Sequence, residues 1–248
     1  MITTQGLIIW IEYSPSGDVV IITCQVTEPF SFLEGQFMML QTLIWDKIVK
    51  RAYSIYSTNQ QLQDSQTISF CIKRKEWGLF SPRATQSAKV GMKISMTWPL
   101  GKFVDTGVSK NYLFVSVGSG LSPCFSIYQN LLQTWSYDKI VNLFGERYLD
   151  HIPAQVLEKY SLQDKKIYNQ IYLSKEENIS EWMKQWYVQD GLQNALVFLW
   201  HSKWSPLTPL FKGGIVVFIC GLPAMCDDVA QRLIDTWFEK SQLIIEKY

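Results

Sequence analysis

The chain has 248 residues, of which 47% are hydrophobic and 18% are charged, and its formal net charge is +1. This composition excludes a disordered chain, because there is ample apolar surface to bury. The near-zero charge gives no sign of a nucleic-acid-binding protein, and the length suits one large domain or two of ordinary size.

The cysteines and the apolar runs exclude several further classes. The five cysteines show neither the C-x2-C pairs of a zinc site nor the C-x4-C-x2-C spacing of a plant-type iron–sulfur cluster. No apolar run approaches the roughly 20 residues of a transmembrane helix, and the first residues lack the pattern of a secretory signal. We therefore expect no metal centre, no transmembrane segment and a cytoplasmic protein with reduced thiols.

The first hundred residues predict an all-β domain. Short β-rich runs are separated by turn residues, and the runs at 67–73 and 92–98 alternate apolar with polar side chains. Closely spaced short strands predict a small antiparallel barrel. The expected strands cover residues 6–12, 19–26, 36–42, 51–55, 67–73 and 92–98.

After about residue 105 the pattern changes to alternating strands and helices, which predicts a parallel sheet covered by helices on both faces. We therefore expect a β-domain over residues 1–104 and an α/β domain over residues 105–248. The Trp-rich segment 191–212 fits neither pattern. The expected strands cover 112–117, 140–144, 167–173 and 215–220, and the expected helices cover 122–135, 152–160, 179–187 and 225–239.

Two glycine-containing turns each follow a predicted strand of the second half and open a helix. The first is residues 118–123, where Ser122 is the expected N-cap and Pro123 the first helical residue. The second is residues 220–225. Ligands of parallel sheets bind outside the carboxyl ends of the strands, so both turns are candidates for one nucleotide crevice. A plain structural turn, and a merely buried Cys220, are the alternatives.

The first half contains two candidate binding motifs. Arg51-Ala52-Tyr53-Ser54 places a cation, a flat ring and a hydroxyl on one strand, which suits a flat, phosphate-bearing cofactor. An amphipathic strand with Arg51 and Tyr53 exposed is the alternative. Residues 78–82 follow the basic run 73–75, and Ser81 with Pro82 predicts a helix N-terminus with Ser81 as the N-cap.

In this order, these motifs resemble those of the ferredoxin–NADP⁺ reductase family of flavoenzymes, over the chain from about Gly35 to Tyr248. Residues 51–54 are similar to the family's R-x-Y-S motif, 78–81 to G-x-x-S, and 99–103 to P-x-G-x-F. Residues 118–123 are similar to G-x-G-x-x-P and 220–225 to C-G-x-P-x-M. The acidic-then-aromatic ending at 246–248 also matches. The G-R-[IV] step of many members is absent, and the segment 191–212 stands in that region.

The resemblance implies an FAD site on the first domain. Arg51 would bind a flavin phosphate, Tyr53 would pack on the isoalloxazine ring, and Ser54 would donate a hydrogen bond near its N5. The residues implied to hold the FAD pyrophosphate are Gly78, Leu79, Phe80 and Ser81.

The resemblance also implies an NADP(H) or NAD(H) site on the second domain. Cys220 would lie near the nicotinamide, and Glu246 near the flavin. Ser54, Cys220 and Glu246 are thus the expected catalytic residues. The other residues implied to bind cofactor here are Gly118, Gly120, Pro123, Gly221, Met225 and, near the flavin, Tyr248.

Selectivity for NADPH over NADH depends on cationic side chains that would bind the 2′-phosphate of NADPH. Arg147 and Lys175 follow two successive strands, where NADP-specific relatives carry basic residues. We therefore expect NADPH over NADH. Alternatively, Arg147 and Asp150 form a surface ion pair of little consequence.

The implied function is that of an NAD(P)H-dependent FAD oxidoreductase, which transfers a hydride from the nicotinamide to FAD and then passes electrons to a separate ferredoxin or flavodoxin. Residues 1–104 hold ten basic and seven acidic side chains, a charge that suits an acidic carrier. A reductase component of an oxygenase or a free-flavin reductase is the alternative. A regulatory flavin-binding protein with an impaired nucleotide site is a further alternative, motivated by the missing G-R-[IV] step.

Overall fold

A computed structural model describes residues 3–28, 30–44, 47–162, 165–176, 183–184, 187–192 and 214–248. The chain divides into two compact units. The first comprises Met1–Asp105 with Phe125–Gln133 and Asp150–Pro153, and the second comprises Thr106–Cys124, Thr134–Leu149 and Ala154–Tyr248. Most of the segment 191–212, including His201, lies outside the described residues.

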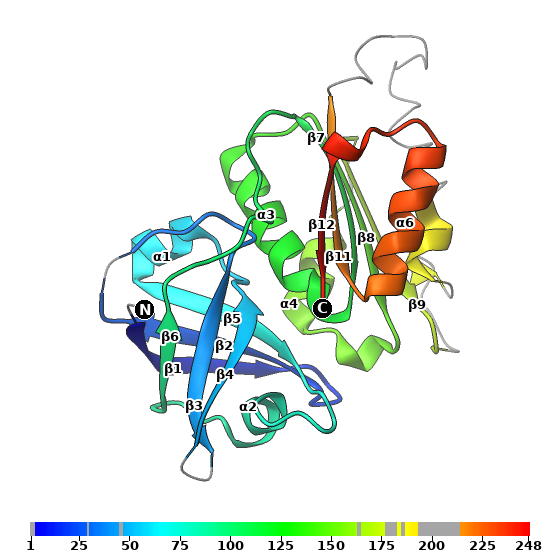
Figure 1. Ribbon diagram of the computed structural model, residues 1–248. Coiled ribbons are helices and arrows are strands. Elements are labelled where there is room, and N and C mark those ends of the chain that lie inside the picture. The colour runs from blue at the N-terminus through cyan, green and yellow to red at the C-terminus, as the bar shows by residue number, and fades with distance from the viewer. Residues whose placement is uncertain are drawn as a thin grey trace. The chain divides into compact units, whose positions relative to one another are not determined.

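The first unit is built on a six-stranded antiparallel sheet in the order β4-β3-β6-β1-β2-β5. The sheet curls, as Figure 1 shows, and a bridge between Ile55, just after β4, and Phe70, in the middle of β5, links the two edge strands. This arrangement confirms the predicted antiparallel barrel. The strands are β1 (Thr3–Tyr13), β2 (Val19–Val26), β3 (Phe37–Ile44), β4 (Lys47–Ser54), β5 (Thr67–Lys73) and β6 (Lys93–Thr97).

The interior of the barrel is filled by apolar side chains from every strand, among them Ile8, Ile22, Leu40, Phe70 and Met96, each 2% exposed or less. Two short helices complete the unit: α1 (Asn59–Ser65) and α2 (Ser81–Ser87). The sequence did not predict α1, because it is polar and buries only Leu62.

The second unit contains a six-stranded sheet in the order β10-β9-β8-β7-β11-β12, with every pair of neighbours parallel. The strand order reverses at β7, since the chain adds β8 on one side and returns to add β11 on the other. The strands are β7 (Asn111–Val117), β8 (Lys139–Glu146), β9 (Ile167–Leu173), β10 (Met183–Lys184), β11 (Ile215–Gly221) and β12 (Leu243–Lys247).

Helices connect these strands and confirm the predicted α/β class. Helix α6 packs its apolar side against the sheet through Met225, Val229 and Leu233 (Figure 1). Helix α4 contacts β8, where the Tyr160 ring meets Phe144 edge-on at 6.0 Å. The helices are α3 (Leu121–Thr134), α4 (Ala154–Tyr160) and α6 (Pro223–Asp235), with short 3₁₀ turns at Gly118–Gly120, Leu149–His151, Val188–Gly191 and Lys240–Gln242. Of these, Phe125–Gln133 of α3 and the end of the Leu149–His151 turn group with the first unit.

Two predicted N-caps were wrong. Ser122 is not an N-cap, because the 3₁₀ turn Gly118–Gly120 runs directly into α3 and places Ser122 inside the helix. Ser81 is the first residue of α2 and Phe80 is its N-cap, since the Ser81 Oγ instead accepts the backbone N–H of Lys75 at 3.0 Å.

The predicted helix over 179–187 was also wrong where the structure describes it. Met183 and Lys184 form β10, which pairs with Ile171 and Tyr172 of β9 and buries Met183. The last predicted helix, 225–239, is shorter at its end, because α6 stops at Asp235 and Trp237 takes a positive φ of 93°.

Candidate functional site

The carboxyl ends of β7 and β11 form the most constrained part of the second unit. These strands are neighbours at the point where the strand order reverses, which is where open parallel sheets bind their ligands. Each strand leads into a glycine with a positive φ, 54° at Gly118 and 152° at Gly221. Such angles strain any other residue, so the two turns depend on glycine.

The two predicted glycine turns touch each other through Gly120. A Cβ atom built on Gly120 would lie 2.2 Å from the carbonyl oxygen of Cys220 and 2.5 Å from the Tyr248 hydroxyl. A Cβ on Gly221 would lie 2.4 Å from Cγ2 of Val117. Only glycine at these two positions lets the turns approach this closely, so the prediction that both lie at one edge of the sheet agrees with the structure.

Tyr248 lies across this edge. Its backbone N–H donates to the Gly221 carbonyl at 3.2 Å, and its hydroxyl donates to the Val117 carbonyl at 3.1 Å. About half of the Tyr248 surface is exposed, but desolvation of its hydroxyl at this edge raises the pKa of the phenol well above the usual value, and a hydrogen bond with Ser119 opposes the shift. The phenol therefore remains protonated and fixes the ring beside the first turn.

Glu246 and Cys220 occupy opposite positions on β12 and β11. Burial raises the pKa of the Glu246 carboxyl, so the carboxyl takes up a proton more readily than an exposed glutamate. The Cys226 thiol lies 3.6 Å from the Glu246 carbonyl oxygen. The structure thus brings together the predicted residues Gly118, Gly120, Cys220, Gly221, Met225, Glu246 and Tyr248.

The thiols around this edge are neutral. Burial raises the pKa of Cys220 and of Cys124 far above the usual thiol value, and it raises that of Cys226 to about 11. A neutral thiol is a poor nucleophile, because the thiolate is the reactive form. Cys220 therefore suits a role in shaping the site rather than in covalent chemistry.

Arg147 and Lys175 are adjacent in the backbone, because they follow the neighbouring strands β8 and β9. The backbone N–H of Lys175 donates to the Arg147 carbonyl at 3.0 Å, and both side chains are exposed. Sequence reasoning missed Glu146, the buried last residue of β8, whose Oε1 accepts the Arg147 N–H at 2.7 Å. The end of β8 thus presents a carboxylate and a cation in consecutive positions.

In the first unit the end of β4 carries the candidate flavin residues. The Tyr53 ring is half-buried and packs on Phe80 with centroids 5.2 Å apart. Burial raises the pKa of the Tyr53 phenol to about 12, against an opposing effect of Arg51. Arg51 is exposed and donates one hydrogen bond to the Lys50 carbonyl at 2.7 Å, which leaves its other N–H groups free for an anion.

The turn before α2 lies beside this ring through Phe80. The Gly78 N–H donates to the Lys75 carbonyl at 2.8 Å, and a Cβ on Gly78 would lie 2.9 Å from the Ser81 Oγ. The turn is therefore compact, and a Cβ on Gly78 would also lie 3.0 Å from the Lys75 carbonyl oxygen, which is a tight contact. The Ser81 hydroxyl keeps its proton for a further acceptor, because its bond with Lys75 uses only a lone pair.

The donor sets of both units fit the cofactors that the motifs imply. The β4 group offers a guanidinium, a phenol and a serine hydroxyl, all donors suited to phosphate and flavin oxygens. At the β7–β11 edge, the glycines bring the two turns into direct contact, since a Cβ on Gly120 would meet the Cys220 carbonyl oxygen. There the buried Ser116 Oγ also has no hydrogen-bond partner among the described residues.

Models of two known domain families match this chain, one in each half of the sequence. A model of the oxidoreductase FAD-binding domain matches residues 12–104, and a model of the oxidoreductase NAD-binding domain matches residues 114–231. Among the described residues, no helix is long and apolar enough to cross a membrane.

Several characterised proteins are similar in sequence over much of the chain. The toluate 1,2-dioxygenase electron transfer component of Pseudomonas putida is 25% identical over 88% of this chain and 59% of its own length. The reductase component of the naphthalene 1,2-dioxygenase system of Pseudomonas putida is 27% identical over 58% of this chain and 42% of its own length. The chain therefore spans about half the length of these relatives.

Solved structures show the same fold. A ferredoxin NADP⁺ reductase from Neisseria gonorrhoeae, with bound FAD and NADP, aligns over 99% of this chain and 98% of its own, with a TM-score of 0.79 and 19% identity. The ferredoxin reductase of carbazole 1,9a-dioxygenase aligns over 99% of this chain and 69% of its own, with a TM-score of 0.80 and 18% identity.

Proposed function

Because the chain belongs to the ferredoxin reductase-like family of FAD- and NAD(P)-binding oxidoreductases, we propose that it is an NAD(P)H-dependent flavin reductase that supplies electrons to a separate protein. The observation that carries the proposal is the contact of Gly120 with Cys220, which joins the two nucleotide-binding motifs at the point where the strand order reverses. We assign FAD binding to residues 1–104 and nucleotide binding to residues 105–248.

Bound FAD would supply the redox chemistry, accepting a hydride from the nicotinamide and releasing electrons singly. The chain's own residues would bind and orient. Arg51 would neutralise phosphate charge, Tyr53 would cover one face of the flavin ring, and Ser54 would donate a hydrogen bond at its edge. Gly78, Leu79, Phe80 and Ser81 would hold the pyrophosphate through their backbone N–H groups and the Ser81 hydroxyl.

In the nucleotide half, Gly118, Gly120 and Pro123 would let the dinucleotide approach the start of α3. Cys220 and Gly221 would shape the nicotinamide pocket, with Met225 packed beneath the turn. The raised pKa of Glu246 favours a role in holding a proton near the reacting rings. Tyr248 would bound the site on the side of the first turn.

We propose NADPH as the preferred nucleotide, because Arg147 and Lys175 place two exposed cations side by side. Glu146 supports the opposite choice, since a carboxylate in this position binds the ribose 2′-hydroxyl of NAD in related folds and repels a 2′-phosphate. NADH is therefore the second candidate.

For the acceptor we propose a ferredoxin or a flavodoxin. A role as the reductase component of an oxygenase is the second candidate, and it is favoured by the curated relatives, which are electron transfer and reductase components of dioxygenases. We also propose a reducing, cytoplasmic location, in keeping with the five cysteines, all of which are free.

An anaerobic absorbance titration of the purified protein tests the proposal. We expect a yellow protein whose flavin band bleaches with NADPH, or with NADH if Glu146 sets the choice. A yellow protein that neither nucleotide bleaches would contradict the reductase function and favour a regulatory flavin protein. A colourless protein that does not bind added FAD would contradict the flavin assignment itself.

A further inference from the structure

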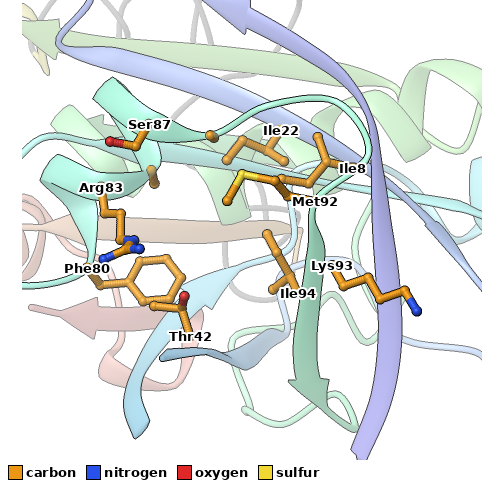
Figure 2. A pocket seen from close by; sticks show the side chains of 11 residues that line it. Ile8, Ile22, Thr42, Phe80, Arg83, Ser87, Met92, Lys93 and Ile94 are labelled. Carbon is orange, nitrogen blue, oxygen red and sulfur yellow. The ribbon is translucent and has the colours of Figure 1, made fainter. Parts of the chain in front are cut away.

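A cavity opens at one mouth of the barrel, between helix α2 and the strands β1, β2, β3 and β6. Its wall is mainly apolar, and Ile8, Ile22 and Phe80 are themselves buried in the barrel core. Figure 2 shows these side chains converging on a space beside α2. The complete lining is Ile8, Ile22, Thr42, Phe80, Arg83, Ala84, Ser87, Ala88, Met92, Lys93 and Ile94.

The size of this cavity limits what it can hold. Its volume is about 50 Å³, whereas a cavity of about 150 Å³ was needed to bind benzene in an apolar core. An aromatic ring is therefore too large, and the end of a linear aliphatic chain fits.

The rim of the cavity carries one cation that faces it. In Figure 2 the Arg83 guanidinium is drawn next to the Phe80 ring, whereas the Lys93 ammonium points away from the other lining side chains. Arg83 is exposed, and no carboxylate among the described residues forms an ion pair with it. The guanidinium therefore has donors available for an anion.

We propose that this barrel-mouth cavity binds a short linear aliphatic carboxylate of about four to six carbons. The end of the tail would enter between Ile8, Ile22 and Met92, where burial of methylene groups is favourable, and the rest of the tail would lie in the mouth of the cavity. The carboxylate would remain at the rim and pair with Arg83, whose planar fork suits it. None of the residues that we assign to FAD or nucleotide binding is needed, except that Phe80 forms part of both walls.

Helix α2 links this cavity to the proposed flavin site. Ala84 faces the cavity, and Ser81 at the start of the same helix is assigned to the FAD pyrophosphate. A ligand beside Ala84 would therefore change the affinity for FAD. This second step depends on the proposed function, whereas carboxylate binding does not.

Methyl NMR of the full-length protein with ¹³C-labelled methionine tests the site. We expect hexanoate to shift the Met92 methyl signal saturably and to leave that of Met225, in the other unit, unchanged. Hexanol should bind at least fivefold more weakly than hexanoate, because it cannot pair with Arg83. Benzoate should leave the signal unmoved, because its ring does not fit.

Matched variants test separately how much the aliphatic tail and the carboxylate charge of the ligand contribute to binding. Arg83→Gln should abolish the preference for hexanoate over hexanol, whereas Lys93→Gln, which removes an equal charge that points away, should preserve it. Ala88→Leu should fill the cavity and abolish the shift with either probe. Equal binding of hexanoate and hexanol, an unshifted Met92 at saturating probe, or binding that survives Ala88→Leu would each overturn the proposal.

A titration of the protein with FAD distinguishes carboxylate binding from its effect on the affinity for FAD. We expect hexanoate to change the FAD dissociation constant at least twofold in the wild type and not in Ala88→Leu. An unchanged constant together with a shifted Met92 would retain the carboxylate site and refute its coupling to FAD. Failure to bind FAD at all would refute the proposed function and leave the Met92 result as an independent test.

Discussion

The carbonyl oxygen of Cys220 lies only 2.2 Å from where a side chain on Gly120 would begin. The first helix turn of the second unit therefore rests directly on the end of β11. Because the obstacle is a backbone atom, no rotamer change relieves the clash. The close approach of the two turns, at the edge where we place the nucleotide, therefore depends on the absence of a side chain at Gly120.

Substitution of Gly120 tests that edge. Gly120→Ala should lower the melting temperature by several degrees and slow flavin reduction by NADPH at least tenfold, because the turns must separate. The flavin content should remain unchanged, since Gly120 lies in the other unit. Gly107→Ala is the control: its φ is positive but nothing lies within 4 Å, so only the backbone strain of about 1 kcal/mol applies. Equal reduction rates in the two variants would contradict the proposed role.

Arg51 is expected to control retention of the flavin. Arg51→Ala should lower the flavin-to-protein ratio after gel filtration, because a charge-assisted bond to phosphate contributes more than a neutral one. Lys50→Ala removes a neighbouring exposed cation of β4 and should leave the ratio unchanged. Full retention of flavin by the Arg51 variant would refute the assignment.

The buried carboxyl of Glu246 gives a pH dependence of known sign. Its folded pKa lies above its ordinary value of 4.5, so the folded state binds a proton more tightly than the unfolded state. The stabilisation is fully present below pH 4.5 and is lost as pH rises through the folded pKa. Glu246→Gln should therefore gain melting temperature relative to wild type between pH 4 and pH 7. Glu158→Gln, which alters an exposed carboxyl, should show a constant difference, and a constant difference for Glu246→Gln would disprove the effect.

The paired cations at the ends of β8 and β9 predict nucleotide selectivity. Replacing both Arg147 and Lys175 with alanine should raise the KM for NADPH at least tenfold and leave that for NADH within twofold. Lys166→Ala, at the opposite end of β9, is the matched control and should alter neither. If Glu146 dominates instead, Glu146→Gln should improve the use of NADPH, and steady-state kinetics with both nucleotides decides between the two.

The central strands could be predicted, because strands that are buried on both faces are nearly continuous runs of apolar residues. Strand β9 was predicted to the residue, and β11 within one residue, since every side chain of β11 is buried and the run is wholly apolar. The barrel strands followed from alternation and turn residues. The motif residues of both cofactor sites were also identified, and their roles remain predictions.

The missed features are those that depend on distant partners. β12 was not predicted, because Leu243–Lys247 is only partly buried and pairs with β11 at the edge of the sheet. Two Ser-Pro pairs suggested N-caps that the backbone does not use, since a 3₁₀ turn precedes one helix and Lys75 engages the other serine. The hydrogen bond from the Tyr248 hydroxyl to the Val117 carbonyl could not be predicted either, because its acceptor is a backbone atom that every residue has.

The edge strands of the parallel sheet affect the tendency of the protein to aggregate. An open strand edge can recruit the same edge of another molecule, and long, flat, apolar edges are the starting points of aggregation. Among the described residues, β10 has only two residues and ends on the exposed Lys184, while β12 has five and ends on Glu246 and Lys247. Charged residues at the ends of these two strands disfavour pairing with the edge of a second copy at the concentrations needed for the experiments above.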